Sequence, residues 1–178
     1  ARGKNQYSGV DETSEKPRID NVVIQNATAL SSDIIAQPLV SENQVFTVIM
    51  RVTNTGGAQA VSVVPVLNVS GSGSVLNLSG PSPASFALNG GATQNFTWTY
   101  SATGTGSVNF AGYAQGTDIN SGLLKQSAST NTGITVQTRP QLNAQIFAFP
   151  AQVTQNQIIT IILGVTNAGQ AQANNVSP

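Results

Sequence analysis

Residues 43–65 read NQVFTVIMRVTNTGGAQAVSVVP, and residues 156–178 read NQIITIILGVTNAGQAQANNVSP. At an offset of 113 residues, more than half of the positions are identical, and most others exchange one apolar residue for another. In the first copy, a run rich in β-branched residues is followed by the turn residues Asn54 to Gly57. Such a run, followed by residues that tolerate positive φ, predicts a strand and a turn. The second copy predicts a repeated structural unit.

The repetition continues on the N-terminal side of both copies. Residues 22–38 match residues 134–150 at an offset of 112, and residues 1–14 match residues 114–127 at an offset of 113. Because the offset is nearly constant over three separate blocks, we infer a repeat of about 113 residues rather than three chance similarities.

We therefore predict one complete repeat and parts of two others. Residues 1–27 are predicted to be the closing strands of a preceding repeat, residues 28–138 the complete repeat, and residues 139–178 the opening strands of a following one. The predicted linker, Arg139-Pro140, is very short. A linker of this kind predicts successive domains that lie end to end with restricted motion.

The complete repeat has the pattern of a protein made only of strands. Short runs with period-two alternation or β-branched residues are separated by Gly, Asn, Ser and Pro turns, and no segment shows sustained helical periodicity. The predicted strands are Leu30–Ala36, Val45–Asn54, Val61–Val69, Val75–Leu78, Thr93–Ser101, Ser107–Gln115 and Gly133–Thr138. Gly80–Ser85 and Ser121–Thr132 are predicted loops, and Pro65 predicts an edge or a bulge. The predicted fold class is all-β, with tandem immunoglobulin-like β-sandwich repeats, one complete and two partial.

The composition excludes several classes of function. The chain has no Cys and no His, which removes the commonest nucleophile–base pairs and zinc ligands. Its formal charge is zero, so the clustered basic residues of a nucleic-acid-binding protein are absent. No apolar run is long enough to span a membrane. No paired acid–base constellation is evident among the seven carboxylates, and we predict that the chain is not an enzyme.

The low content of charged residues indicates where the protein works. Charged residues make up 8% of the chain, against about 25% in an ordinary soluble domain. The surface must therefore consist mainly of Ser, Thr, Asn, Gln and Gly, which is typical of secreted wall and appendage proteins. We predict an extracellular or cell-surface location in a prokaryote.

Several motifs of the complete repeat resemble one known family. They are Val52-Thr53-Asn54-Thr55-Gly56, Leu88-Asn89-Gly90-Gly91, Phe96-Thr97-Trp98-Thr99-Tyr100, Gly104-Thr105-Gly106 and Ile134-Thr135-Val136. In this order they resemble the CARDB-like domain, a cell-adhesion-related module of bacterial and archaeal surface proteins. The resemblance implies an immunoglobulin-like fold and a role as stalk, spacer, adhesin module or filament component. It implies no catalytic residue, because the family carries no catalytic motif.

One loop offers a candidate metal site. Asp118 and Asn120 place oxygen ligands at alternate positions before Gly122, which is how a calcium loop can begin. The other interpretation is a turn that uses Asp, Asn and Gly for their backbone tolerance. The equivalent position in the N-terminal segment is Asn5, and only one carboxylate is present. We favour the turn, and we expect no cofactor.

Other candidate sites concern carbohydrate. Five N-x-S/T sequons could carry glycans, at Asn26, Asn68, Asn77, Asn95 and Asn175. Phe96, Trp98 and Tyr100 lie at period two and therefore share one face of a strand. They could form a platform for sugars, but a same-face aromatic row on a central strand is more typical of a core.

The sequence favours a structural or adhesive module, part of a surface stalk, fibre or filament. The alternative is a carbohydrate-binding or spacer module of a secreted enzyme. The expected partners are adjacent repeats or neighbouring copies of the chain, with strand complementation as one route. That route follows from the two partial repeats, because an incomplete sandwich exposes unpaired backbone groups and apolar faces. The missing strands could instead lie on the same polypeptide.

Overall fold

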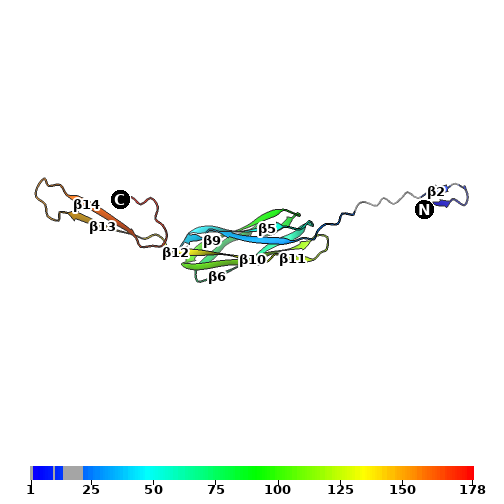
Figure 1. Ribbon diagram of the computed structural model, residues 1–178, viewed down its shortest axis with the longest axis horizontal. Coiled ribbons are helices and arrows are strands. Elements are labelled where there is room, and N and C mark those ends of the chain that lie inside the picture. Colours follow the sequence, from blue (N-terminus) through cyan, green and yellow to red (C-terminus); the bar gives the residue numbers. More distant parts are fainter. Residues whose placement is uncertain (1, 10, 14–21) are drawn as a thin grey trace.

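The computed structural model of the chain describes residues 2–9, 11–13 and 22–178. A β-sandwich occupies the middle of the molecule (Figure 1), with a small hairpin towards each end of the chain. The N-terminal hairpin pairs β1 (Arg2–Lys4) with β2 (Asp11–Thr13), and the C-terminal hairpin pairs β13 (Leu142–Phe149) with β14 (Thr160–Asn167). The segment between β2 and residue 22, part of the predicted preceding repeat, lies outside the described residues.

The sandwich consists of two sheets. The four-stranded sheet has the order β3 (Leu30–Ala36), β5 (Val45–Asn54), β9 (Thr93–Gly104) and β7 (Ser74–Ser82). The six-stranded sheet has the order β4 (Leu39–Ser41), β12 (Thr130–Gln137), β10 (Gly106–Asp118), β6 (Ala60–Gly71) and β8 (Phe86–Leu88), with β11 (Leu124–Gln126) paired to β10. In chain order these are the ABED and GFC sheets of an immunoglobulin fold. The strand order confirms the predicted all-β, immunoglobulin-like sandwich.

The first strand is divided between the two sheets. β3 pairs antiparallel with β5, whereas β4 pairs parallel with β12 in the opposite sheet. Pro38 lies between β3 and β4, and it cannot donate a backbone hydrogen bond to a ladder. The chain therefore leaves one sheet at this residue and joins the other, which closes that side of the sandwich.

The core lies between the sheets and follows from alternation in the long strands. In β5, β9 and β10, every second residue is buried, as expected for strands with one face on a core. Phe46, Tyr100 and Phe110 meet at the centre, with ring centroids 5.2–6.3 Å apart. Tyr100 also belongs to the aromatic row of β9, whose other members, Phe96 and Trp98, are buried as well. The row is therefore part of the core and forms no exposed platform for sugars.

The structure corrects several sequence predictions of local structure. The predicted loop Gly80–Ser85 is wrong at its start, because β7 continues to Ser82 with three register shifts against β9. The predicted loop Ser121–Thr132 contains β11 and the beginning of β12. β4 and β8 were also not predicted. These short strands have too few residues to show a period, and only the longer neighbouring strands define them.

The turn after β5 is organised by the buried amide of Asn54. Its Oδ1 accepts hydrogen bonds from the N–H groups of Gly56 at 3.1 Å and Ala29 at 3.3 Å. Its Nδ2 donates to the carbonyl oxygens of Ala58 at 2.7 Å and Leu88 at 3.1 Å. One side chain thus joins the entry segment, the turn and β8. Gly56 is required in this turn, because a Cβ there would lie 2.7 Å from the backbone nitrogen of Ala29.

We expect Asn54→Ala to lower the free energy of unfolding by about 2–4 kcal/mol, because it leaves several buried backbone groups without partners. The measurement is urea unfolding of the full chain, followed by the fluorescence of Trp98. Thr53→Ala is the control, since its hydroxyl bond to Thr93 at 2.8 Å is exposed. That variant should lose less than about 1 kcal/mol. Equal losses in both variants would contradict the role of Asn54.

Candidate functional site

Directly after its last strand, the C-terminal end of the sandwich is hydrogen-bonded to the residues that follow β14. β12 ends at Gln137, whose carbonyl oxygen accepts a hydrogen bond from Glu42 N–H at 2.8 Å. The next residue, Thr138, already contacts the hairpin. Its N–H donates to Gln170 Oε1 at 3.1 Å, its Oγ1 accepts from Gln170 N–H at 2.9 Å, and its carbonyl accepts from Ala171 N–H at 3.0 Å. Three hydrogen bonds therefore hold the first residue after the sandwich.

The N-terminal end of the sandwich holds its entry segment in the same way. The carbonyl oxygen of Asn26 accepts from Gly57 N–H at 3.1 Å and Ala58 N–H at 2.8 Å. Thr28 Oγ1 donates to the carbonyl oxygen of Ala58 at 3.1 Å. Asn26 precedes Thr138 by 112 residues, and Ala58 precedes Ala171 by 113. The bond from Ala58 to Asn26 thus has its counterpart in the bond from Ala171 to Thr138.

The same correspondence holds throughout the hairpin. β13 pairs with β14 with Leu142 opposite Asn167, as Leu30 lies opposite Asn54 in the β3–β5 pair. Asn167 Oδ1 accepts from Gly169 N–H at 3.0 Å and from Gln141 N–H at 3.0 Å, and its Nδ2 donates to Ala171 O at 2.9 Å. These are the counterparts of three of the four bonds of Asn54. The hairpin and the turn after it therefore have the local structure of the β3–β5 pair and its turn.

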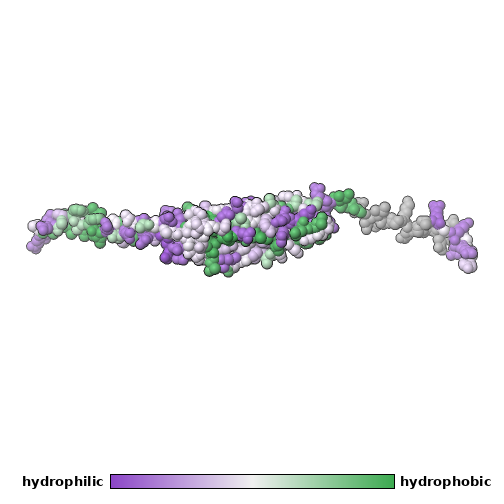
Figure 2. Space-filling view, turned by 90° about the horizontal axis from the view of Figure 1, so that it is seen from below, coloured by the Kyte–Doolittle hydropathy of each residue, from purple (hydrophilic) through white to green (hydrophobic). Residues whose placement is uncertain are grey.

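One face of the hairpin exposes apolar side chains whose counterparts are buried in the sandwich. Ile34 is 4% exposed in the sandwich, and its counterpart Ile146 is 72% exposed. The same face exposes Leu142, Ile161, Leu163 and Val165, whose counterparts Leu30, Val48, Met50 and Val52 are buried. The other face carries Phe147, Phe149 and Ile162, whose counterparts are exposed or half-buried. Figure 2 shows hydrophobic side chains along this hairpin. The described residues therefore include an apolar sheet face with no second sheet over it.

Asp118 fastens the entry segment to the loop that follows β10. Its Oδ2 accepts from Thr28 N–H at 2.7 Å, and its Oδ1 accepts from Asn120 N–H at 3.0 Å and Ser121 N–H at 2.9 Å. The residue is buried. The hydrogen bond from Thr28, followed by that from Ser121, holds the pKa of this carboxyl well below its usual range. The carboxylate therefore acts as an acceptor that joins two segments 90 residues apart.

The loop at Asn5, in the N-terminal hairpin, has the same turn as the loop at Asp118. Gly9 N–H donates to Asn5 O at 2.9 Å, as Gly122 N–H does to Asp118 O at 2.9 Å. Asn5 Oδ1 accepts from Tyr7 N–H at 3.0 Å and Ser8 N–H at 3.1 Å. Gly3 lies opposite Glu12 as Gly116 lies opposite Lys125. An amide at this position forms the same turn as a carboxylate does.

The calcium candidates Asp118 and Asn120 belong to one turn, in which both side chains already form hydrogen bonds. Both oxygens of Asp118 accept backbone hydrogen bonds, and Asn120 Nδ2 donates to Gln25 Oε1 at 3.3 Å. The described residues contain no group of three or more acidic, His or Cys side chains able to hold a metal ion. A calcium ion would have to replace the N–H donors of this turn. The calcium site stays a prediction, and the geometry favours the turn.

The five sequon asparagines are all exposed: Asn26, Asn68, Asn77, Asn95 and Asn175. Asn68 and Asn77 lie on β6 and β7, and Asn95 lies on β9. Exposure is a requirement for an acceptor asparagine, and glycosylation at each of them stays a prediction. Asn26 is also part of the junction, through its backbone carbonyl. Separately, no helix in the described ranges is long and apolar enough to cross a membrane.

We expect Asp118→Asn to destabilise the sandwich at pH 7, because an amide oxygen accepts hydrogen bonds more weakly than a carboxylate. The folded pKa is depressed, so the stabilisation by the carboxylate is fully present above the unfolded pKa of about 4. It is lost as the pH falls from there towards the folded pKa. The difference between wild type and variant should therefore shrink between pH 5 and pH 2, measured by urea unfolding at each pH.

Asp33→Asn is the control for this titration, because Asp33 forms an exposed ion pair with Arg51 at 3.2 Å. Its effect at pH 7 should stay below about 1 kcal/mol. A deficit of Asp118→Asn that is constant with pH would contradict the role of the ionised carboxylate. The same unfolding series with calcium or with a chelator tests the metal candidate, and we expect no difference between the two.

The comparisons with known proteins concern the fold. No protein-family model and no curated protein matches this sequence. The chain is similar to the crystal structure of native alpha-2-macroglobulin from Escherichia coli that spans domain MG7 to the C-terminus, with a TM-score of 0.53 and 16% identity. The match covers 68% of this chain and 19% of that one, so the chain spans about a fifth of the macroglobulin structure.

Two smaller solved structures are also similar to this chain. The CARDB domain of the PF1109 protein from Pyrococcus furiosus, in complex with di-metal ions, has a TM-score of 0.43 and 12% identity, covering 64% of this chain and 97% of that one. The cohesin module of a family 33 glycoside hydrolase from Clostridium perfringens has a TM-score of 0.43 and 10% identity, covering 63% and 99%. A CARDB domain, the module that the sequence motifs resemble, is thus among the similar structures. The strand order of residues 30–137 makes this part of the chain an immunoglobulin-like β-sandwich.

Proposed function

We propose that this chain is a non-catalytic, extracellular structural module of a prokaryotic surface stalk, fibre or filament. In this proposal, immunoglobulin-like repeats of about 113 residues follow one another end to end, and the described sandwich is the complete one. Residues 1–27 close a preceding repeat, and residues 139–178 open a following one. The role is mechanical, because rigid sandwiches in series extend and hold a structure at a distance from the cell.

The observation that carries the proposal is the correspondence between the β13–β14 hairpin and the β3–β5 pair of the sandwich. The register of the strands, the bonds of Asn167 and the left-handed φ of Asn156 all have counterparts 112 or 113 residues earlier. Asn43, the counterpart of Asn156, has a φ of 67°, and Asn156 has a φ of 65°. The Asn5 loop and the Asp118 loop form a second set of counterparts, 113 residues apart.

A mechanical role also requires that successive repeats resist bending. Thr138 follows β12 directly and makes three hydrogen bonds to Gln170 and Ala171. Hydrogen bonds at Thr138 and at Gln141, on either side of the short linker Arg139-Pro140, restrict the motion of the two units it joins. The charged residues are few, which limits repulsion between neighbouring stalks and permits lateral packing.

A chimera tests whether the hairpin is the opening half of such a repeat. Residues 139–178 are joined directly to residues 66–138, so that Pro178 takes the place of Pro65. We expect this chimera to fold with one cooperative transition, at a stability a few kcal/mol below that of the sandwich, because Ile159 replaces Phe46 in the core. The measurement is thermal unfolding by circular dichroism, with dispersed amide signals in NMR.

Two matched variants of the chimera sharpen this test. Pro140 takes the place of Thr28 and has no N–H for Asp118, so Pro140→Thr should restore that bond and raise the stability. Ile161→Asp places a charge where Val48 is fully buried and should abolish folding. A chimera without a cooperative transition, in both the parent and the Pro140→Thr form, would disprove the tandem repeat.

A second experiment tests the stiffness of the junction. Thr138→Gly together with Gln170→Gly removes the side-chain bonds between β12 and the hairpin, so the hairpin should reorient more freely. We expect lower order parameters for residues 142–167 than in the wild type, with those of residues 30–137 unchanged, measured by 15N relaxation. Thr135→Gly and Gln172→Gly serve as the control pair. Equal order parameters in all three proteins would mean that the junction bonds do not limit motion.

The alternative function, a carbohydrate-binding or spacer module of a secreted enzyme, stays a prediction. The aromatic row of β9 that would have served sugar binding lies in the core. A screen of the chain against a glycan array addresses the binding role directly, and we expect no signal.

A further inference from the structure

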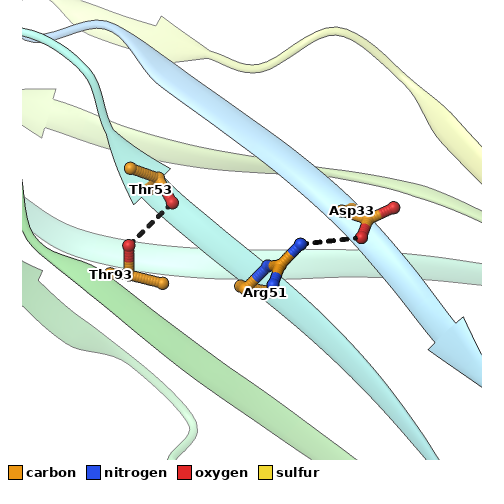
Figure 3. A network of polar contacts seen from close by, with 4 residues as sticks. All are labelled: Asp33, Arg51, Thr53 and Thr93. Atoms are coloured by element: carbon orange, nitrogen blue, oxygen red, sulfur yellow. Dashed lines mark hydrogen bonds and ion pairs between the residues drawn. The ribbon is translucent and has the colours of Figure 1, made fainter.

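One side of the sandwich carries no charge. Residues 52–117 contain no Asp, Glu, Lys or Arg, and they include β6, β7 and β8. The charges of the four-stranded sheet lie on its other strands, where Asp33 of β3 pairs with Arg51 of β5 (Figure 3). Lys125 lies on β11. The side formed by β6, β7 and β8 therefore neither attracts nor repels a charged partner.

This side also presents strand edges without partners. β6 pairs with β10 as far as Gly71, but it pairs with β8 only at Ala60 and Val63. Within the described residues, Val64–Gly71 thus has a neighbouring strand on one side only. β7 is the last strand of its sheet on the same side. Unpaired edges expose N–H and C=O groups that can bind another strand. We name Val64–Gly71 together with β7 the neutral edge.

The β6 part of the neutral edge has little of the protection that natural sheet edges carry, whereas β7 contains Pro81 and three register shifts against β9. Edges are usually guarded by Lys, by inward-pointing charges or by Pro. Pro65 removes one donor at the start of the edge of β6, but Val66–Gly71 has neither a charge nor a Pro. The exposed apolar residues at this side are Val69, Leu76, Leu78 and Phe86. Figure 2 views the sandwich from the side where β6 lies in Figure 1 and shows hydrophobic side chains among hydrophilic ones.

We propose that the neutral edge binds the neutral edge of a second copy of this chain, with the two β6 strands antiparallel across a two-fold axis. The partner must be uncharged, must offer an open strand edge and must cover apolar side chains, and the same surface of another copy meets all three requirements. A two-fold contact of this kind is self-complementary. The six-stranded sheets of the two copies then form one continuous sheet. The inference deepens the proposed function and rests on it, since it supplies the lateral contact of a fibre.

The contact between two single sandwiches is small. A strand pair over Val66–Gly71 buries less surface than a standard protein–protein interface. The dimer of single chains is therefore weak, with a dissociation constant of about 1 mM or tighter. Repeats in series would form many such contacts at once, and the effective concentration of each further contact is then high. A weak contact per repeat therefore suffices for a stable bundle.

The test compares two matched lysine variants of the full chain. Val69→Lys places a charge on the neutral edge, and Ile35→Lys places the same charge on β3, at the opposite side. The two side chains are 43% and 44% exposed, and urea unfolding of both variants separates a loss of folding from a loss of the dimer. Sedimentation equilibrium at about 1 mM chain should show a dimer for the wild type and for Ile35→Lys. For Val69→Lys the dissociation constant should rise at least about tenfold, because two like charges meet across the axis.

Further measurements separate this contact from others. Added salt should leave the wild-type dimer unchanged and partly restore that of Val69→Lys, because salt screens only the introduced charges. The chain has no Cys, so Asn68→Cys should form a disulfide dimer faster than Ser31→Cys does. A monomeric wild type, equal effects of the two lysines, or equal rates for the two cysteines would overturn the proposal. A glycan on Asn68 of the native protein would also overturn it, because the glycan would cover the edge.

Association through the exposed face of the β13–β14 hairpin is the competing outcome. Ile161→Lys should leave the dimer intact if the neutral edge forms it, and loss of the dimer in this variant would overturn the proposal. The folding of the chimera of residues 139–178 and 66–138 tests the proposed tandem repeat independently. A folded chimera together with equal effects of the two lysines would rule out the proposed lateral contact alone. An unfolded chimera would rule out the proposed tandem repeat.

Discussion

The apolar face of a β-sheet is stable in water only when a second apolar face covers it, and this requirement governs the whole molecule. In the sandwich, alternate residues of β5 and β9 meet alternate residues of β10, and the aromatic rings of Phe46, Tyr100 and Phe110 fill the space between them. The β13–β14 hairpin has the same alternation and the same register but no second sheet. Its exposed apolar face is the physical reason for interpreting it as half of a domain.

The polar interactions fix the positions of segments that the apolar packing alone does not fix. Asn54 and Asp118 are buried, and both satisfy backbone groups of the entry segment at Ala29 and Thr28. Burial of a polar group is costly unless it is hydrogen-bonded, so these side chains tolerate only one arrangement of the chain around them. Asn167 repeats the bonds of Asn54 to the entry segment and to the turn, whereas Asn5 repeats only the turn bonds of Asp118. These turn bonds therefore form with or without a second sheet over the neighbouring strands.

The distribution of charge separates the two sides of the sandwich. The ion pair of Asp33 and Arg51 lies on the face of β3 and β5, whereas β6, β7 and β8 carry neutral side chains along open edges. A stalk of rigid repeats needs contacts at the domain ends, and a fibre needs contacts between stalks as well. The junction at Thr138 supplies the first kind of contact, and the neutral edge is suited to the second.

The sequence by itself determined the strand content, the long strands, the aromatic core row and the repeat pattern, because each of these is a periodic property of consecutive residues. It also indicated the turns at Asn54 and Asp118, since Asn, Asp and Gly favour them whatever surrounds them. Only the tertiary structure decided the short strands β4, β8 and β11, the acceptor role of the Asp118 carboxylate toward Thr28, and the open edge of β6. These features depend on which segments meet across the fold, and residues far apart in the chain carry no local period that would reveal the meeting.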